Sequence, residues 1–217
     1  MKKKIIIVVL WLLIWQLLAL LIHNQILIAG PIETFKSLGT MIFTADFWGS
    51  VISTGLRIIY GLTLGTAAGI LIAVLSYKVA IIKDFMSPFI TVMKAIPVAS
   101  FVIIVLIWMG NTNLSVIISM LVVFPIMYLN TLEGLYDVDK KLLEMADVYN
   151  MSLFNQIKYI FFPEMYYYLV SGFSLAVGLA WKSGVAAEVI GQPLGTIGNE
   201  LYRAKIYLET ADLFAWT

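Results

Sequence analysis

Cysteine is absent from this 217-residue chain, His23 is its only histidine, and only 12% of its residues carry a charge. The lack of cysteine excludes disulfides, thiolate metal sites and cysteine nucleophiles, and one histidine argues against a histidine-ligated metal site. Fourteen basic and thirteen acidic residues give a net charge of +1, which indicates neither a nucleic-acid partner nor an acidic one. Soluble domains are about 25% charged and about 45–50% apolar, whereas this chain is 61% hydrophobic. The sequence therefore predicts a single domain embedded in a membrane.

Apolar runs long enough to cross a bilayer recur along the chain. A helix needs about 20 apolar residues to span about 30 Å of hydrocarbon. Runs of this kind occupy residues 5–22, 51–76, 88–109, 114–129 and 165–181, and an extension of the last run through 185–190 is left open. Residues 213–217 resemble the first turn of a sixth span, which we expect to be truncated. The prediction is an all-α polytopic bundle of five spans plus the start of a sixth.

The N-terminal segment 1–22 combines a basic start with an apolar run, as a signal peptide does. No small-x-small cleavage site follows the run, so we interpret 1–22 as a retained anchor helix, followed by a core over 51–217. Basic residues concentrate in the short loops expected on the inner side, namely 1–4, 77–87 and 130–163. The sequence thus predicts a multi-pass protein of the cell membrane with a cytoplasmic N-terminus.

Glycine and proline mark specific positions inside the spans. Gly61, Gly65 and Gly69 share one helix face, which favours close helix packing within one subunit or across a dimer. A gating contact is the functional alternative. Pro97 and Pro125 remove backbone hydrogen bonds inside their spans, which predicts kinked or interrupted helices.

Four residues in or beside the spans are candidates for a translocation pathway. They are Lys94, Pro97, Trp181 and Glu188. Snorkelling to the membrane interface explains Lys94 as well, and an aromatic belt explains Trp181. No P-loop and no Gly-x-Ser-x-Gly elbow is present, so the sequence predicts no catalytic residue, no cofactor and no metal.

The inner loop 130–163 is unusually organised for a connector. Residues 142–149 have helical composition and stop at Asn150, a residue type that tolerates the left-handed conformation after a helix. Ser152 is placed to cap a second helix, and Pro163 fits the first turn of the next span. We expect two short helices that project into the cytoplasm, with the small side chain of Ala146 on a surface that docks a soluble partner.

Within this loop, the spacing of several residues follows a known pattern. Glu144-Met145-Ala146 is followed after three residues by Asn150, and after nine more by Ile160-Phe161-Phe162-Pro163. This arrangement resembles the EAA loop of ABC-importer permeases, and departs from it at Met145, Asn150 and Phe162. Residues 88–110, 124–134 and 181–191 are similar to the nitrate, sulfonate, taurine and bicarbonate branch of these permeases.

The resemblance implies a type I ABC importer permease that forms a homodimer. It implies that each EAA loop docks on one of two ABC ATPase subunits, that an external substrate-binding protein delivers the solute, and that the permease is not itself an enzyme. The branch implies a small organic or inorganic anion as solute, or alternatively a thiamine-precursor pyrimidine or riboflavin. Two other classes stay open: a secondary transporter or channel, and a structural membrane subunit.

Overall fold

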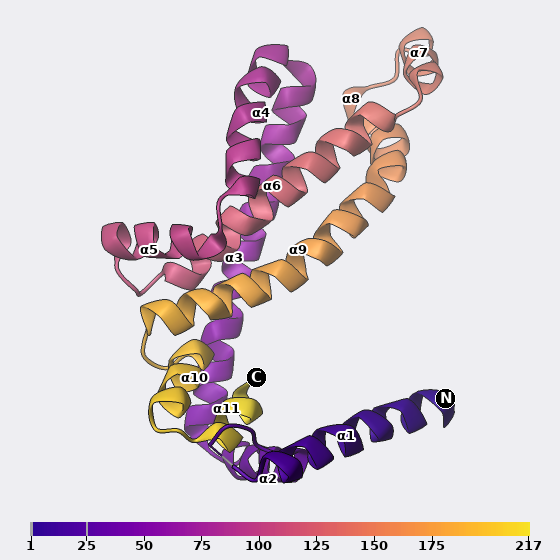
Figure 1. Cartoon of the computed structure of the whole chain (residues 1–217). Coiled ribbons are helices and arrows are strands. Elements are labelled where there is room, and N and C mark those ends of the chain that lie inside the picture. Colours follow the sequence, from indigo (N-terminus) through magenta and orange to yellow (C-terminus); the bar gives the residue numbers. More distant parts are fainter. Residues whose placement is uncertain (1, 25) are drawn as a thin grey trace. The chain divides into compact units, whose positions relative to one another are not determined.

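The computed structural model describes residues 2–24 and 26–217, and this part of the chain is helical and contains no strand. The all-α prediction is confirmed (Figure 1). The elements are α1 (Lys2–Ile22), α2 (Pro31–Met41), α3 (Ala45–Lys78), α4 (Ala80–Ala95), α5 (Val98–Met109), α6 (Leu114–Asp137), α7 (Lys140–Val148), α8 (Leu153–Gln156), the π-helical turn η1 (Ile157–Phe161), α9 (Phe162–Gly191), α10 (Ile197–Ile206) and α11 (Thr210–Trp216).

Four helical runs in the described residues are long and apolar enough to cross a membrane: Lys3–Ile22, Ala45–Lys78, Leu114–Asp137 and Leu153–Gly191. The pair α4 and α5 passes the same test as one broken span, bent by 101°. These five segments contain the five apolar runs of the sequence. Length and composition thus agree with a polytopic membrane bundle.

The helices extend well beyond the apolar runs. α6 continues through residues 130–137, and α8, η1 and α9 follow one another without a break from Leu153 to Gly191. Of the expected loop 130–163, only residues 138–139 and 149–152 lie outside helices. Hydropathy marks where a helix enters the hydrocarbon. The ends of the helix depend instead on capping residues, which lie outside the apolar run.

The two prolines that sequence analysis singled out behave differently. α4 ends at Ala95, Ile96 is extended with ψ 129°, and Pro97 precedes the first residue of α5, so the predicted interruption is present. Pro125, in contrast, lies buried inside α6, which runs uninterrupted from Leu114 to Asp137. A proline withholds one backbone hydrogen bond and restricts the residue before it. Membrane helices tolerate an internal proline where neighbouring groups satisfy the freed backbone.

The chain divides into two compact units, with the boundaries inside α3 and α9. The first unit comprises Met1–Gly55 and Glu188–Thr217. In this unit α11 packs on α2 and α10, and the Ser37 hydroxyl donates a 2.6 Å hydrogen bond to Asp212. Residues 213–217, expected as the first turn of another span, belong largely to α11.

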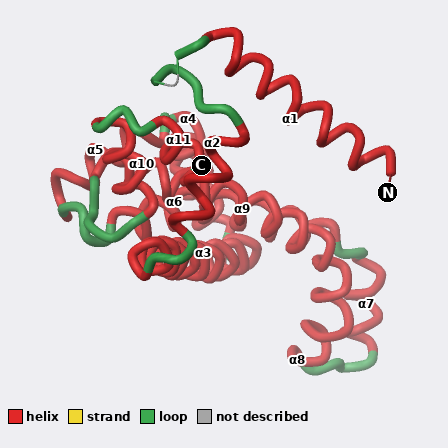
Figure 2. The backbone as a smooth tube through the Cα atoms, turned by 90° about the horizontal axis from the view of Figure 1, so that it is seen from below, coloured by secondary structure: helices red, strands yellow, loops and turns green. Residues whose placement is uncertain are grey.

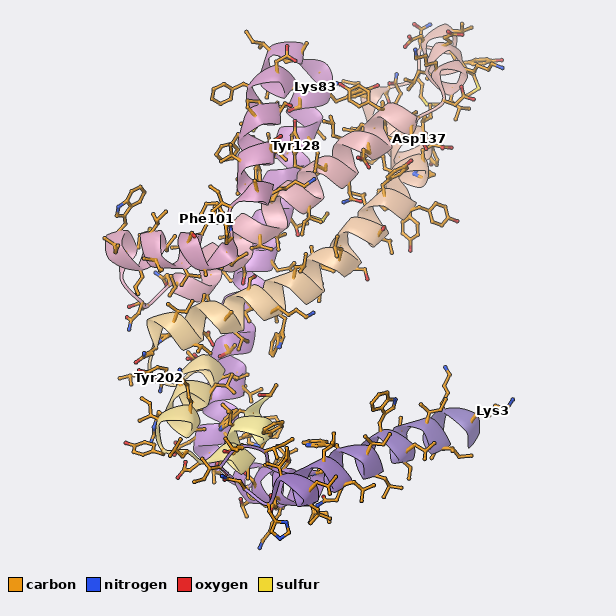
Figure 3. The ribbon with its side chains drawn as sticks, in the orientation of Figure 1. Lys3, Lys83, Phe101, Tyr128, Asp137 and Tyr202 are labelled. Carbon is orange, nitrogen blue, oxygen red and sulfur yellow. The ribbon has the colours of Figure 1, made fainter. Side chains whose placement is uncertain are left out.

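The second unit, Leu56–Ala187, holds three long helices in mutual contact, α3, α6 and α9, with α4 and α5 packed on α6. Its core lies between α3, α6 and α9 and includes Ile58, Val123 and Ala180. α7 and α8 lie beyond the N-terminal end of α9, as the tube in Figure 2 shows. The side chains of this unit, with Lys83, Phe101, Tyr128 and Asp137 labelled, are drawn in Figure 3.

Candidate functional site

Residues 138–163 fold into a helical hairpin, here called the α7 hairpin, in which α7 turns back onto α8 and η1. Asp139 caps α7 by accepting a 2.9 Å hydrogen bond from the Lys141 amide. Asn150 has φ +50°, the left-handed conformation predicted for it, and the Met151 amide closes the turn on the Ala146 carbonyl at 2.8 Å. Ser152 caps α8 as predicted, because its hydroxyl accepts from the Asn155 amide. Local sequence signals therefore define both ends of the turn.

A small apolar cluster holds the α7 hairpin together. Val138, Ala146 and Ile160 are buried in it, and four partly buried side chains pack around them: Leu142, Leu143, Met151 and Phe161. Ala146 is 0% exposed. The expectation that Ala146 lies on the docking surface is therefore wrong for the described chain. The residue faces the inside of the hairpin, where its single methyl group lets α7 approach η1.

The opposite side of the α7 hairpin exposes large apolar side chains. Val148 and Tyr149 are 77% and 78% exposed, and the other members of this surface, here called the hairpin tip, are Met145 and Phe154. Glu144 is exposed beside them. An exposed group of large apolar side chains of this kind is typical of an interaction surface.

The return arm of the α7 hairpin continues directly into α9. In η1 the Phe162 amide bonds to the Ile157 carbonyl, the i to i−5 pattern of a π turn. Pro163 follows immediately and has no amide hydrogen to donate. Pro163 lies near the start of α9 as expected, and the helical run is not interrupted there. The hairpin and the spanning helix are thus parts of one continuous helical run.

The three glycines of α3 contact α6 of the same chain. A Cβ atom on Gly65 would lie 2.8 Å from the Met120 carbonyl oxygen, and one on Gly69 would lie 2.8 Å from Met127 Cβ. On Gly61 it would collide with the Val116 carbonyl. These positions bring the two helix backbones together within one subunit, the packing mode that small residues allow in membranes.

Two of the pathway candidates lie on separate helices of the second unit. Lys94 borders a groove of about 280 Å³ between α4 and α6, close to the break at Pro97. Trp181 is an exposed side chain of α9 and does not line this groove. The structure thus places Lys94 and Pro97 together, and Trp181 apart from them.

Glu188, the fourth pathway candidate, belongs to the first unit and is fully buried. Its carboxylate accepts a 2.8 Å hydrogen bond from the Thr54 hydroxyl and a 3.4 Å bond from the Gly198 amide. The Ile197 amide donates to the same Thr54 hydroxyl at 2.9 Å. The carboxylate therefore lies at the N-terminus of α10, where the helix dipole favours a negative charge. These contacts give Glu188 a structural role, and Thr54 was not singled out by sequence analysis.

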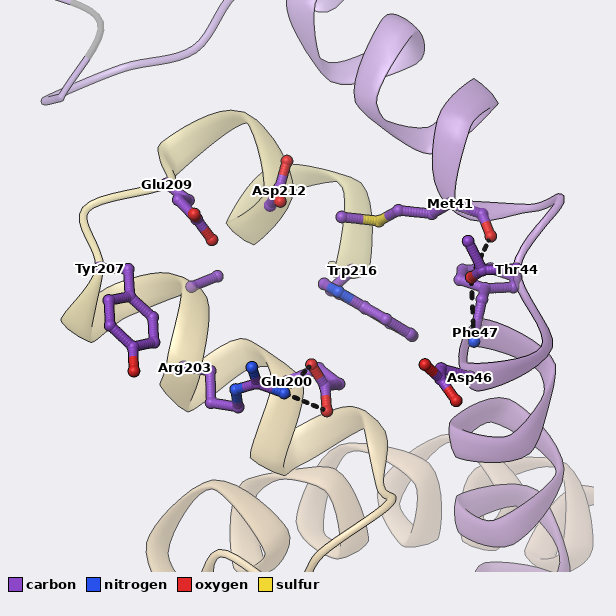
Figure 4. Close-up of a pocket in the computed structure, with 11 residues that line it drawn as sticks. Met41, Thr44, Asp46, Phe47, Glu200, Arg203, Tyr207, Glu209, Asp212 and Trp216 are labelled. Carbon is purple, nitrogen blue, oxygen red and sulfur yellow. Dashed lines mark hydrogen bonds and ion pairs between the residues drawn. The ribbon is translucent and has the colours of Figure 1, made fainter.

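A pocket of about 250 Å³ in the first unit, shown in Figure 4, was not foreseen from the sequence either. Its wall contains one basic residue, Arg203, which pairs with Glu200 at 3.4 Å. Three further carboxylates line it, those of Asp46, Glu209 and Asp212. Segments about 150 residues apart in the chain form this pocket, so no local motif marks it.

Comparison with known proteins adds the class to which this arrangement belongs. Residues 65–215 match the family model described as binding-protein-dependent transport system inner membrane component. A Bacillus subtilis protein named as an aliphatic sulfonates transport permease is 25% identical over 205 residues, which cover 93% of this chain and 74% of the relative. A nitrate import permease of Synechococcus elongatus is 27% identical over 83% of this chain and 68% of its own length. A probable ABC transporter permease of Haemophilus influenzae is 25% identical over 98% of this chain and 86% of its own length.

The chain is a polytopic helical membrane protein of the permease class. It belongs to the family of binding-protein-dependent transport system inner membrane components, the permeases of ABC transporters. The matched residues include the whole α7 hairpin and α9. The relatives are named for transport rather than for catalysis, and the family together with the apolar helices places the chain in the inner membrane as a multi-pass protein.

Proposed function

We propose that this chain forms the translocation pathway of an ATP-driven importer for a small organic or inorganic anion, such as an aliphatic sulfonate or nitrate. The family match and the names of two relatives support the solute class. A thiamine-precursor pyrimidine or riboflavin is the alternative solute.

The observation that carries the proposal is the α7 hairpin with its exposed tip. An ABC ATPase subunit covers the tip, and the apolar side chains of Met145, Val148 and Tyr149 enter a cleft on it, with Glu144 at the edge. The remaining residues of the motif shape the hairpin: Ala146 and Ile160 form its core, and Asn150 makes its turn. Pro163 marks the point at which the hairpin becomes the spanning helix.

Coupling follows from the continuity of the helical run. ATP binding draws two ATPase subunits together, and each moves the hairpin docked on it. Because α8, η1 and α9 are continuous from Leu153 to Gly191, this motion passes into the membrane. Differential contacts of the ATPase in its two states then shift the permease between inward-facing and outward-facing conformations.

Two copies of the chain complete the pathway, and an external binding protein delivers the solute. α9 supports dimerisation because one side of it carries exposed apolar residues, among them Val170, Phe173 and Val177. These residues line an open groove of about 580 Å³ together with α3 and α6. Lys94, Pro97 and Trp181 remain pathway candidates in this proposal, whereas Glu188 positions α10. The N-terminus and the α7 hairpin lie on the cytoplasmic side.

Reconstitution tests the proposal directly. The chain, its ATPase and its binding protein are placed in proteoliposomes, and uptake of radiolabelled ethanesulfonate and nitrate is measured with ATP, with a non-hydrolysable analogue and with ion gradients alone. ATP-dependent uptake that requires the binding protein is the expected result. Uptake driven by an ion gradient without ATP would indicate a secondary transporter. A complex that moves no solute under any of these conditions would indicate a structural subunit.

A further inference from the structure

Helix α4 carries a polar stripe that the family comparison does not explain. Lys83, Ser87, Thr91 and Lys94 recur at intervals of four, four and three residues and therefore share one helix face. The adjacent face is apolar: Ile90 on it is buried against Ala73, Tyr128 and Leu132 of α3 and α6. The stripe thus runs along the edge of the contact between α4 and the rest of the second unit.

The polar stripe borders the groove of about 280 Å³ between α4 and α6. The α6 wall consists of Tyr128, Leu129 and Leu132, and the Tyr128 hydroxyl is engaged with the Ser76 hydroxyl at 3.1 Å. The lining contains two lysines and no carboxylate. Its volume is close to the lower end of the range of small-ligand sites, roughly 300 Å³. A cavity of this size and charge suits a small anion.

The stripe runs from the expected inner loop 77–87 into the third apolar run, 88–109. Eleven residues separate Lys83 from Lys94, about 16 Å along a helix, which is about half of the 30 Å hydrocarbon core. A lipid phosphate occupies one level of the bilayer and does not match a stripe of this length. Lys83 belongs to the expected inner loop, and Lys94 lies six residues inside the apolar run that begins at Pro88, about 9 Å along a helix.

The deep end of the stripe lies at the break between α4 and α5. Lys94 is in the last turn of α4, two residues before Ile96, and the chain then bends by 101°. Lys94 has no ion-pair partner within residues 2–24 and 26–217, whereas Lys83 lies 4.5 Å from the Tyr136 ring centroid. Cations within membrane segments face water-filled cavities or pathways, and broken helices line the binding sites of transporters.

We infer that the groove between α4 and α6 is the oxyanion-binding segment of the solute pathway. Lys94 binds the sulfonate, nitrate or carboxylate group of the passing solute at the helix break. The Ser87 hydroxyl donates a hydrogen bond along the groove, and Lys83 attracts the anion at the other end. This inference rests on the proposed function and adds the residues that select a negative charge.

Because the chain has no native cysteine, single-cysteine labelling read on this chain alone, after its separation from the ATPase by gel electrophoresis, tests the inference. Ser87→Cys and Thr91→Cys are made separately in the full chain, which is purified with its ATPase and placed in phosphatidylcholine nanodiscs. Each protein is treated with the anionic 2-sulfonatoethyl or the cationic 2-(trimethylammonio)ethyl methanethiosulfonate. Each rate is divided by the rate of the same reagent with a free small thiol.

The expected result is that the groove raises the normalised rate of the anionic reagent about five-fold and lowers that of the cationic reagent by the same factor, which gives a preference of about thirty-fold at both positions. One positive charge at roughly 8 Å and an effective dielectric constant of about 40 changes the rate of each reagent by about five-fold, in opposite directions for the two reagents. Lys94→Gln added to Thr91→Cys should remove most of the preference, and Lys94→Arg should restore it. Lys36→Gln, on α2 and outside the groove lining, is the matched control and should leave the preference unchanged. Phe89→Cys, on the opposite face of α4, should react slowly with both reagents.

Competition identifies the anion. Ethanesulfonate should slow labelling at Thr91→Cys, whereas phosphatidylglycerol in the nanodisc should not. Slowing by phosphatidylglycerol alone would assign the groove to a lipid headgroup and overturn the inference, as would equal normalised rates for the two reagents. Uptake measured with the same variants in proteoliposomes, with the ATPase and the binding protein, separates the two proposals. ATP-driven uptake without charge preference contradicts only the groove assignment, and charge preference without ATP-driven uptake contradicts only the importer.

Discussion

The α3–α6 contact and the α7 hairpin lie in the same compact unit, yet they are held together in different ways. At the contact, glycines bring helix backbones so close that any side chain would collide with a carbonyl or a Cβ atom of α6. In the hairpin, three buried residues and four partly buried ones form the cluster. Its tip exposes Val148 and Tyr149 almost completely. The first region excludes alternative packing, whereas the second leaves apolar surface for a partner.

This difference matches what a coupled permease requires. A helix pair packed at backbone distance moves as a rigid body, because close-packed interiors transmit displacement instead of absorbing it. The hairpin tip is not covered by the described chain, so its apolar side chains are available to the ATPase of the proposal. The predictions below test the contrast between the two regions, beginning with the largest expected effect.

Gly65→Leu should disrupt the α3–α6 contact. The new Cβ atom would lie 2.8 Å from both the Met120 carbonyl oxygen and Val123 Cβ. Overpacking typically costs about 1–3 kcal/mol, and a backbone collision places this variant at or beyond the upper end. Thermal unfolding in detergent should show a large loss of stability or no folded protein. Gly178→Leu on α9 is the matched control because its Cβ atom meets nothing within 4 Å. Equal stability of the two variants would contradict the packing argument.

Ala146→Asp should open the α7 hairpin and leave the helix bundle folded. The carboxylate would enter a fully buried position among apolar side chains. An unsatisfied buried polar group costs about 1–3 kcal/mol, and a charged one costs more. Hydrogen exchange should therefore accelerate in residues 138–163 and stay unchanged in α3 and α6. The neighbouring Asp147→Asn, at an exposed position, should alter neither. Slow exchange in the Ala146→Asp hairpin would restore the outward-facing interpretation of this residue.

Val148→Asp should weaken ATPase binding without unfolding the hairpin, because this side chain is 77% exposed. A charge placed in an apolar cleft removes a central contact, and such contacts are worth about 2 kcal/mol or more. We expect the dissociation constant for the ATPase to rise by at least about ten-fold, measured by titration of the nanodisc complex. Val148→Thr keeps the shape without the charge and should have a smaller effect. Unchanged affinity in both variants would place the ATPase contact elsewhere.

Asn150→Gly should change the stability of the hairpin least, because the effect of a glycine depends on the backbone conformation of the position that it occupies. Asn150 has φ +50°, where glycine meets no steric cost. The substitution should therefore change hairpin stability by only a few tenths of a kcal/mol, whereas Asn150→Ala should destabilise it by about 1 kcal/mol. Asn155→Gly, within α8, should also cost about 1 kcal/mol because a helical position penalises glycine. Hydrogen exchange of the hairpin amides measures all three.

Much of this architecture was predictable because its signals are local. Apolar runs located the spans, and Pro97 marked the interruption. Asn150 and Ser152 marked the ends of the turn, because each acts on its own backbone or on an amide a few residues away. The inner side of the α7 hairpin was not predictable in this way. Ala146 faces Ile160, and the register between α7 and η1 depends on how the turn closes.

The polar groups show the same limit. Lys94 was recognised as a candidate, but its groove requires α6 as a second wall. Glu188 was recognised as well, but its role follows from Thr54, Ile197 and Gly198, which meet it through the fold. In each case the residue type identified a candidate, whereas the residues next to it in the sequence did not reveal its partners in the fold.

Membrane insertion, the order of the helices and the position of their turns follow from the amino-acid sequence alone, because hydrocarbon imposes a length and backbone caps act over one turn. The tertiary structure alone decided which side of each helix is covered and which polar side chains share a cavity. Those properties depend on contacts between segments far apart in the chain, and the sequence of one segment does not identify the segment that packs against it.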